Sequence, residues 1–214
     1  MDFGTNQKQH HKEEKTTQED SALRQDILPL IGSITGRAGE GKRILVTIDG
    51  PCASGKTTLA RMLAEAMNCD VIHTDDFVVP HRQKTPERIA VPGGNCDWER
   101  LVREVVMPWK CGSEVRYQKY DCHKDRLTPH EPVQSDKLLI LEGCYSNLPA
   151  IREYADVRLF LKAPEEERYK RLSRRETPES LARFQSLWIP LENAYFEAYG
   201  LPDAGCIVWT MKNI

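Results

Sequence analysis

A run of eight residues in the first third of the chain carries the strongest chemical signal. Residues 50–57, Gly-Pro-Cys-Ala-Ser-Gly-Lys-Thr, fit the phosphate-loop pattern GxxxxGK[ST]. In such a loop, backbone N–H groups and the positive N-terminus of the following helix cradle phosphate oxygens. The Lys56 ammonium then reaches the β- and γ-phosphates, and the Thr57 hydroxyl can ligate Mg²⁺. The residues expected to contact the nucleotide are Gly50, Ala53, Ser54, Gly55, Lys56, Thr57 and Thr58.

The segments on either side of this loop have the pattern that phosphate binding requires. An apolar, β-branched run at 44–49 precedes the loop, and a helix is predicted from Lys56 to about Met67. The apolar face of that helix consists of Leu59, Met62, Leu63 and Ala66. An ordinary glycine-rich turn is the alternative, but it does not require a strand and a helix in register with the loop. We therefore predict that the chain binds a nucleoside triphosphate, ATP in the first instance.

Two adjacent aspartates follow the next apolar segment, at 71–74. The carboxyl ends of parallel strands open onto the ligand crevice, so a carboxylate here points toward the γ-phosphate region. A kinase that acts on an alcohol needs a carboxylate to accept the hydroxyl proton. Asp75 and Asp76 project differently, so we expect only one of them to be this base. The alternative is an aspartate pair that caps a loop or a helix.

Glu142 ends another aliphatic run, at 138–142, and Gly143 after it allows close approach of the backbone. A carboxylate in this place belongs to the Mg²⁺ shell of phosphate-loop proteins. Thr57 and Glu142 are therefore the predicted metal ligands. A surface glutamate at a strand end is the alternative, which the four aliphatic residues before Glu142 disfavour.

A basic run at 168–175 contains five Lys and Arg residues among eight, without an acid. Arg168, Arg171 and Arg175 share one face of the predicted helix, and a transferring phosphoryl group needs cationic clamps. We interpret residues 165–176, approximately, as a lid over the reacting phosphates. The alternative is a solvated helix face, for which the preceding glutamates at 165–167 offer partners four residues away.

The order of the predicted elements indicates one α/β domain at 21–214, after a polar, disordered tail at 1–20. Strands are predicted at 44–49, 71–74, 138–142, 157–161 and 206–209. Helices are predicted from Ser21, at 56–67, 97–107, 164–175 and 179–199, with loop or irregular chain at 77–96 and 118–132. Strands that are apolar throughout and separated by helices are typical of a mainly parallel sheet. The predicted fold is therefore that of the P-loop nucleoside triphosphate hydrolases, with five strands and helices on both faces.

The composition argues against several classes of protein. Lys and Arg total 30 against 32 Asp and Glu, a net charge of −2 that lacks the positive field of a nucleic-acid binder. No apolar run approaches the roughly 18 residues of a membrane span, and no export signal is visible. Seven cysteines without a CxxC pair then indicate reduced thiols in a cytoplasm. The expected partner is a small-molecule acceptor, not nucleic acid or a membrane, and homo-oligomer formation is left open.

In their order and spacing, these segments resemble the uridine kinase group of the uridine kinase/phosphoribulokinase/pantothenate kinase family. The matching segments are IDGPCASGKTT (48–58), TDDF (74–77), NCDWERL (95–101), YQKYDCHKDRL (117–127), LLILEG (138–143) and ERYKRLSRR (167–175). The resemblance covers residues 40–210, approximately. It implies a phosphate-loop kinase that uses ATP and Mg²⁺ to phosphorylate the 5′-hydroxyl of a nucleoside such as uridine or cytidine.

The resemblance also implies roles for individual residues. Asp75 matches the carboxylate that takes the proton from the sugar 5′-hydroxyl, and Asp97 matches the acid that binds the ribose 2′- and 3′-hydroxyls. Tyr120 matches the tyrosine of the base pocket, while Thr57 and Glu142 match the Mg²⁺ ligands. Arg171 and Arg175 match the arginines of the family's lid. Arg168 and Arg174 are further candidates, for binding the substrate.

The segment that would contact a pyrimidine departs from the family pattern. His123 lies closer to Tyr120 than the family histidine does, and Lys124 and Arg126 occupy nearby positions. Three hypotheses about the acceptor therefore stay open. The first is uridine or cytidine, and the second is another hydroxyl compound such as pantothenate or a sugar. The third is a nucleotide-binding switch protein that uses no acceptor.

Overall fold

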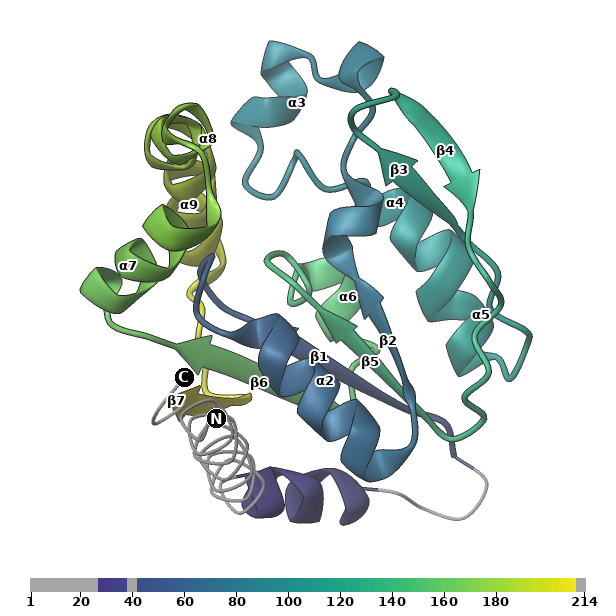
Figure 1. Ribbon diagram of the computed structural model, residues 1–214. Helices are drawn as coiled ribbons and strands as arrows, with labels where there is room; N and C mark the ends of the chain where they lie inside the picture. Colours follow the sequence, from purple (N-terminus) through teal and green to yellow (C-terminus); the bar gives the residue numbers. More distant parts are fainter. Residues whose placement is uncertain (1–26, 38–41, 211–214) are drawn as a thin grey trace, which may run out of the picture.

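A parallel five-stranded sheet forms the centre of the computed structural model, which describes residues 27–37 and 42–210. Its strands run in the order β2-β5-β1-β6-β7 (Figure 1), and every pairing is parallel. They are β1 (Ile44–Asp49), β2 (Asp70–His73), β5 (Leu138–Glu142), β6 (Val157–Lys162) and β7 (Cys206–Thr210). The predicted fold class is confirmed, while the predicted tail lies outside the described residues.

The burial of the central strand β1 explains why its sequence does not alternate between apolar and polar residues. All of its residues are buried. Ile44 and Val46 belong to the apolar cluster on one face of the sheet, and Leu45 belongs to the cluster on the other face. Successive strand residues point to opposite faces, so a strand covered on both sides needs apolar side chains on both.

Two helices cover the first face of the sheet (Figure 1). They are a helix at 27–35 and α2 (Lys56–Met67). Ile27, Leu30 and Ile34 are buried against the sheet, and Leu59 and Leu63 of α2 join the same cluster. The helix predicted from Ser21 is confirmed over its described residues. The predicted apolar face of α2 is confirmed at Leu59, Met62 and Leu63, whereas Ala66 is exposed.

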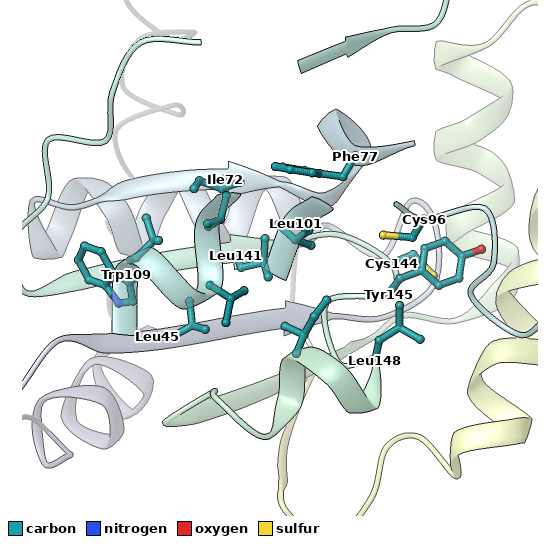
Figure 2. Close-up of a cluster of buried hydrophobic side chains, with 14 of the residues drawn as sticks. Leu45, Ile72, Phe77, Cys96, Leu101, Trp109, Leu141, Cys144, Tyr145 and Leu148 are labelled. Atoms are coloured by element: carbon teal, nitrogen blue, oxygen red, sulfur yellow. The ribbon is translucent and has the colours of Figure 1, made fainter. Parts of the chain in front are cut away.

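The second face carries a larger core, of which Figure 2 shows the centre. A continuous helical stretch made of α4, a π-helical turn and α5 supplies Leu101 and Trp109 to it. Trp109 is fully buried, and its indole Nε1 donates to the Ile44 carbonyl at 3.1 Å. The stretch consists of α4 (Trp98–Leu101), the π turn (Val102–Val106) and α5 (Met107–Lys110). A separate short helix, α6 (Pro149–Arg152), contributes Ile151 to the same core. The predicted helix at 97–107 therefore exists and extends to Lys110.

The prediction that residues 77–96 are loop is wrong in part. This segment contains short 3₁₀ turns and one helix, α3 (Pro86–Ala90). Thr85 is the N-cap of α3, because its hydroxyl accepts from the backbone N–H of Arg88 at 3.2 Å. The Thr-Pro-Glu sequence is a helix-start signal, with proline at the first helical position. The 3₁₀ turns are Thr74–Phe77, at the segment's start, and His81–Gln83.

The prediction that residues 118–132 are irregular is also wrong in part. An antiparallel hairpin forms there from β3 (Gln118–Asp121) and β4 (Arg126–Pro129). Its turn is held by the Asp121 carboxylate, which accepts from the backbone N–H groups of His123 and Lys124. The side chains of β4 are mostly exposed, so the apolar alternation that identifies a strand is absent from the sequence.

A series of helices follows β6 and runs along the edge of the sheet nearest β6 and β7 (Figure 1). The series consists of α7 (Glu165–Arg175), α8 (Pro178–Arg183), a π-helical turn (Phe184–Trp188) and α9 (Ile189–Tyr199). The helices predicted at 164–175 and 179–199 are thereby confirmed. No helix within the described residues is long and apolar enough to cross a membrane.

Candidate phosphate-transfer site

The phosphate loop connects the end of β1 to the start of α2, as predicted. At Gly50 (φ +141°), a Cβ atom would lie 2.3 Å from the Leu161 carbonyl oxygen, so only glycine lets the loop pass β6. Ala53 and Gly55 have positive φ values of 57° and 100°. Left-handed residues within a turn direct consecutive N–H groups toward an anion, which is the backbone form of a phosphate site.

Polar groups around the loop fit an anionic ligand. The Lys56 ammonium folds over the loop and donates to the carbonyl oxygens of Gly50 and Pro51, at 2.8 and 2.9 Å. Within the described residues, Ser54 Oγ and Arg168 Nε are buried without a hydrogen-bond partner. Buried polar atoms are normally hydrogen-bonded, so these two donors fit the phosphate oxygens of a nucleotide.

The two predicted metal ligands meet at the end of β5. Thr57 Oγ1 donates to Glu142 Oε1 at 3.0 Å, and the Glu142 side chain is buried. Gly143 (φ +130°) lets the chain after β5 pass close to Thr74, since a Cβ there would lie 1.9 Å from Thr74 Oγ1. Hydroxyl and carboxylate oxygens are ligands that Mg²⁺ prefers, so this donor set fits the ion.

His73 is a neighbour of Glu142 that the sequence analysis did not identify. Its Nδ1 contacts Glu142 Oε1 at 2.5 Å. The hydrogen bond to Glu142 raises the pKa of His73 above its ordinary value, and burial opposes it. The contact follows from the parallel register, which places His73 of β2 beside Glu142 of β5.

The two adjacent aspartates have different surroundings. Asp76 Oδ2 accepts from the Tyr117 hydroxyl at 3.1 Å and pairs with the Lys119 ammonium at 3.3 Å. Asp75, in contrast, is exposed, and none of the described residues forms a hydrogen bond with its carboxylate. Asp75 is therefore the free carboxylate of the pair.

Asp75 lies within the electrostatic field of the phosphate site. Desolvation by the surrounding protein raises the pKa of its carboxyl above the ordinary value. The Lys56 ammonium lowers the pKa, and the Glu142 carboxylate raises it. The predicted base, the loop lysine and a predicted metal ligand thus share one site at the carboxyl ends of β1, β2 and β5.

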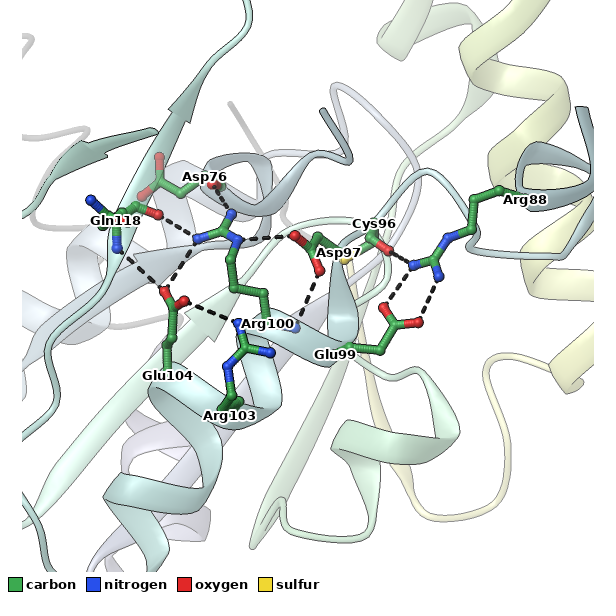
Figure 3. A network of polar contacts seen from close by, with 9 residues as sticks. All are labelled: Asp76, Arg88, Cys96, Asp97, Glu99, Arg100, Arg103, Glu104 and Gln118. Carbon is green, nitrogen blue, oxygen red and sulfur yellow. Dashed lines mark hydrogen bonds and ion pairs between the residues drawn. The ribbon is translucent and has the colours of Figure 1, made fainter. Parts of the chain in front are cut away.

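Asp97 belongs to a network centred on Arg100 (Figure 3). Asp97 caps α4 by accepting from the Arg100 backbone N–H at 3.2 Å, and its second oxygen accepts from Arg100 Nε at 3.0 Å. The buried Arg100 guanidinium also donates to the carbonyl oxygens of Asp76 and Gln118. The network ties the α4 N-terminus to the 3₁₀ turn that carries Asp75 and Asp76.

Tyr120 lies on β3, one of the two strands of the hairpin. Its hydroxyl bonds to the Asp125 carboxylate and accepts from the His81 backbone N–H at 3.2 Å. The hairpin is therefore linked to the turn that follows the two aspartates. Tyr120 is buried.

The arginines of α7 divide into two groups. Arg168 Nη1 approaches the Cys52 carbonyl at 3.5 Å, and Arg171 Nη1 donates to the Ala53 carbonyl at 3.1 Å. Arg175, at the end of α7, donates to Glu176 at 2.8 Å and lies over the Phe184 ring. Arg174 is exposed. The structure thus brings Arg168 and Arg171 to the phosphate loop, whereas Arg175 contacts Glu176 and Phe184 instead.

Two buried carboxylates beside the loop escaped the sequence analysis. Asp49 accepts from the backbone N–H of Gly50 at 2.7 Å, and burial raises its pKa to about 6. Glu192 of α9 accepts from the backbone N–H of Cys52 at 2.8 Å. An acid directly before the loop, at the end of an apolar strand, is a signal that could have identified Asp49. No local signal marks Glu192.

The parallel sheet, the phosphate loop and the carboxylates at the strand ends define a phosphate-loop protein of the kinase type. The chain belongs to the family described as an AAA domain (AAA_18), whose model matches residues 46–199. A comparison with curated proteins gave no match.

Several solved structures share this fold over nearly their whole length. A Silicibacter sp. TM1040 protein described as a candidate fructose transport system kinase is 26% identical, with a TM-score of 0.65 over 89% of this chain and 98% of that chain. A "possible uridine kinase" from Bacillus stearothermophilus is 20% identical, with a TM-score of 0.63 over 91% of this chain and 99% of that one. D-glycerate 3-kinase from Cryptococcus neoformans is 14% identical, with a TM-score of 0.60 over 89% and 94%.

These likenesses support the predicted resemblance at the level of P-loop kinases. The structures are described as kinases of different acceptors, so they do not distinguish the uridine kinase group from its relatives. The chain is a P-loop kinase-like protein, and these comparisons do not identify its acceptor.

Proposed function

We propose that this protein is an ATP-dependent kinase that phosphorylates a primary hydroxyl group of a small molecule. The observation that carries this proposal is the setting of Asp75. It is a carboxylate at the carboxyl edge of the sheet with which no described residue forms a hydrogen bond, and the charges of Lys56 and Glu142 both shift its pKa. A phosphate-loop protein that only binds or hydrolyses a nucleotide does not need a base in this place for an alcohol.

The loop residues bind and orient the triphosphate. Backbone N–H groups of the loop and the first turn of α2 hold the phosphate oxygens, and Lys56 exchanges its bonds to loop carbonyls for bonds to the β- and γ-phosphates. Thr57 and Glu142 would hold Mg²⁺, which neutralises phosphate charge when it is bound.

Asp75 then accepts the proton of the acceptor hydroxyl as its oxygen attacks the γ-phosphorus. The bond between the γ-phosphorus and the bridging oxygen breaks, so ADP leaves and a phosphate monoester forms. Arg168 and Arg171 are close enough to the loop to clamp the transferring group. A closed lid also keeps water from taking the place of the acceptor.

A nucleoside, uridine or cytidine, is the acceptor that the sequence resemblance supports. In that proposal Asp97 binds the ribose hydroxyls, Tyr120 borders the base, and the enzyme serves nucleoside salvage in the cytoplasm. A carboxylate has about four acceptor sites, so Asp97 keeps capacity for ribose while it pairs with Arg100.

Another hydroxyl acceptor, such as a sugar or pantothenate, is the second candidate. The engagement of both Asp97 oxygens and of the Tyr120 hydroxyl within the protein favours it. The descriptions of two structural relatives as kinases of other compounds agree with it.

An assay of ADP release from Mg·ATP tests the proposal. The panel contains uridine, cytidine, adenosine, deoxynucleosides, pantothenate and simple sugars. A saturable signal with a pyrimidine nucleoside supports the first acceptor, and a signal confined to a non-nucleoside supports the second. A flat panel with bound ATP would contradict the kinase proposal for these acceptors and favour a nucleotide switch.

A further inference from the structure

One face of α9 contacts the phosphate loop and the residue directly before it. The Tyr195 hydroxyl donates to Asp49 Oδ2 at 2.7 Å, directly before the loop. Glu192 Oε2 accepts from the Cys52 backbone N–H at 2.8 Å, within the loop. Helix residues three apart lie on the same face, so α9 presents both side chains to the loop together.

Glu192 is an unusual residue to find in this place. Its side chain is buried, and burial raises the pKa of its carboxyl. The ammonium of Lys56, the bond from Cys52 and the guanidinium of Arg168 oppose that rise. Burying a carboxylate near a site for an anionic triphosphate costs free energy, because the carboxylate loses hydration and repels the phosphates. We therefore expect the hydrogen bond between Glu192 and the loop to have a function that outweighs this cost.

The residue that Glu192 holds is adjacent to a strained part of the loop. Ala53 follows Cys52 and has a φ value of 57°, a conformation that costs an L-residue free energy. Arg171, from a second helix, α7, donates to the Ala53 carbonyl at 3.1 Å. The Cys52–Ala53 segment is thus held on its N–H side by α9 and on its carbonyl side by α7.

We propose that Glu192 is a positioning residue of the nucleotide site, which fixes the Cys52 amide and so holds the loop in its phosphate-binding shape before nucleotide arrives. This inference rests on one part of the proposed function, namely that the loop binds ATP. Glu192 acts through Cys52 and does not touch the nucleotide. A loop that is already ordered loses less conformational entropy on binding, and ATP affinity rises accordingly.

The test compares ATP affinity in three variants, measured by calorimetry with Mg·ATP in the absence of an acceptor. Glu192→Ala removes the bond to Cys52, and we expect ATP affinity about tenfold weaker. Glu192→Gln keeps an oxygen that accepts from Cys52, and we expect an affinity within about threefold of wild type. Glu197→Ala alters an exposed glutamate of the same helix, and we expect no change.

Two results would overturn the proposal. The first is unchanged ATP affinity in Glu192→Ala. The second is an equal loss in the alanine and glutamine variants, which would assign the effect to the charge of Glu192 and not to its hydrogen bond. A merely structural role would lower the thermal midpoint of Glu192→Ala and leave the affinity of the folded protein unchanged.

A second measurement covers the case in which Glu192→Ala does not fold. Hydrogen exchange of wild-type protein without nucleotide is expected to show a protected Cys52 amide, with faster exchange in Glu192→Gln than in wild type but not full exposure. An unprotected Cys52 amide in the wild type contradicts the proposal. ATP affinity and exchange need no acceptor, so a failed acceptor panel would count against the kinase proposal alone.

Discussion

The hydroxyl of Thr57 donates to Oε1 of Glu142 over 3.0 Å, which joins the first turn of α2 to the end of β5. The two residues are 85 positions apart in the chain. Parallel pairing of β1 with β5 sets Ile48 opposite Glu142, so the strand that leads into the loop and the strand that carries the carboxylate end together. Both predicted metal ligands therefore lie at one edge of the sheet.

The first prediction concerns the metal. Glu142→Gln removes the negative charge of a proposed Mg²⁺ ligand, so we expect the Mg²⁺ concentration for half-maximal activity to rise about tenfold or more. Titration of Mg²⁺ at fixed ATP measures this shift, and removal of Mg²⁺ with EDTA should abolish turnover. Glu153→Gln, at an exposed position, is the control. An unchanged Mg²⁺ requirement in Glu142→Gln would remove this residue from the metal site.

The second prediction distinguishes the two aspartates. Asp75→Asn removes the proposed base, and we expect kcat to fall about 10²- to 10⁴-fold while Mg·ATP affinity stays close to wild type. Asp76→Asn is the matched control, because Asp76 is held by Tyr117 and Lys119, and a smaller loss is expected. Turnover at a near-native rate in Asp75→Asn would show that another group accepts the proton.

The third prediction concerns pH. Only ionised Asp75 can accept a proton, so kcat/KM must fall as the pH drops through the pKa of this residue in the free enzyme. Desolvation raises that pKa above the ordinary value of 3.8, with Lys56 opposing. We therefore expect the acidic limb of kcat/KM to lie above pH 3.8. A profile that stays flat down to that pH, with the protein still folded, would contradict the assignment.

The fourth prediction concerns the Arg100 network. Arg100→Met leaves the partly buried carboxylate of Asp97 without its cation and removes one of the two cations that pair with Glu104, so we expect a loss of about 3–5 kcal/mol in the free energy of unfolding. Arg103→Met is the control, because the Arg103 side chain is 68% exposed and its pair with Glu104 contributes about 1 kcal/mol or less. Urea unfolding measures both variants, and equal losses would contradict the network's role.

Much of the site could be predicted because its signals are local. The loop pattern, the strand before it and the helix after it are contiguous, and the structure places them as expected. Asp75 and Glu142 were predicted as site residues because the sequence places each at or directly after the end of an apolar strand, and strand ends in a parallel sheet meet at one edge. From the residue types alone the choice between Asp75 and Asp76 was open, since the partners of Asp76 are Tyr117, directly before β3, and Lys119 on β3, both more than forty residues away.

The hairpin and α3 were missed for two physical reasons. The exposed strand β4 has no apolar face to produce alternation, and it forms because β3 pairs with it. The α3 helix is only five residues long, too short for a periodic pattern, and its capping threonine was the available signal. Arg175 was grouped with Arg168 and Arg171 by helical spacing alone, whereas the end of α7 directs it to Glu176 and Phe184.

The sequence by itself determined the fold class, the phosphate loop and the strand-end carboxylates, because each depends on the types and spacing of neighbouring residues. The tertiary structure alone decided which aspartate stays free, which arginines reach the loop, and that α9 places Glu192 against Cys52. These contacts join residues that are distant along the chain. Chain folding and side-chain packing set them, and no local pattern of residues encodes them.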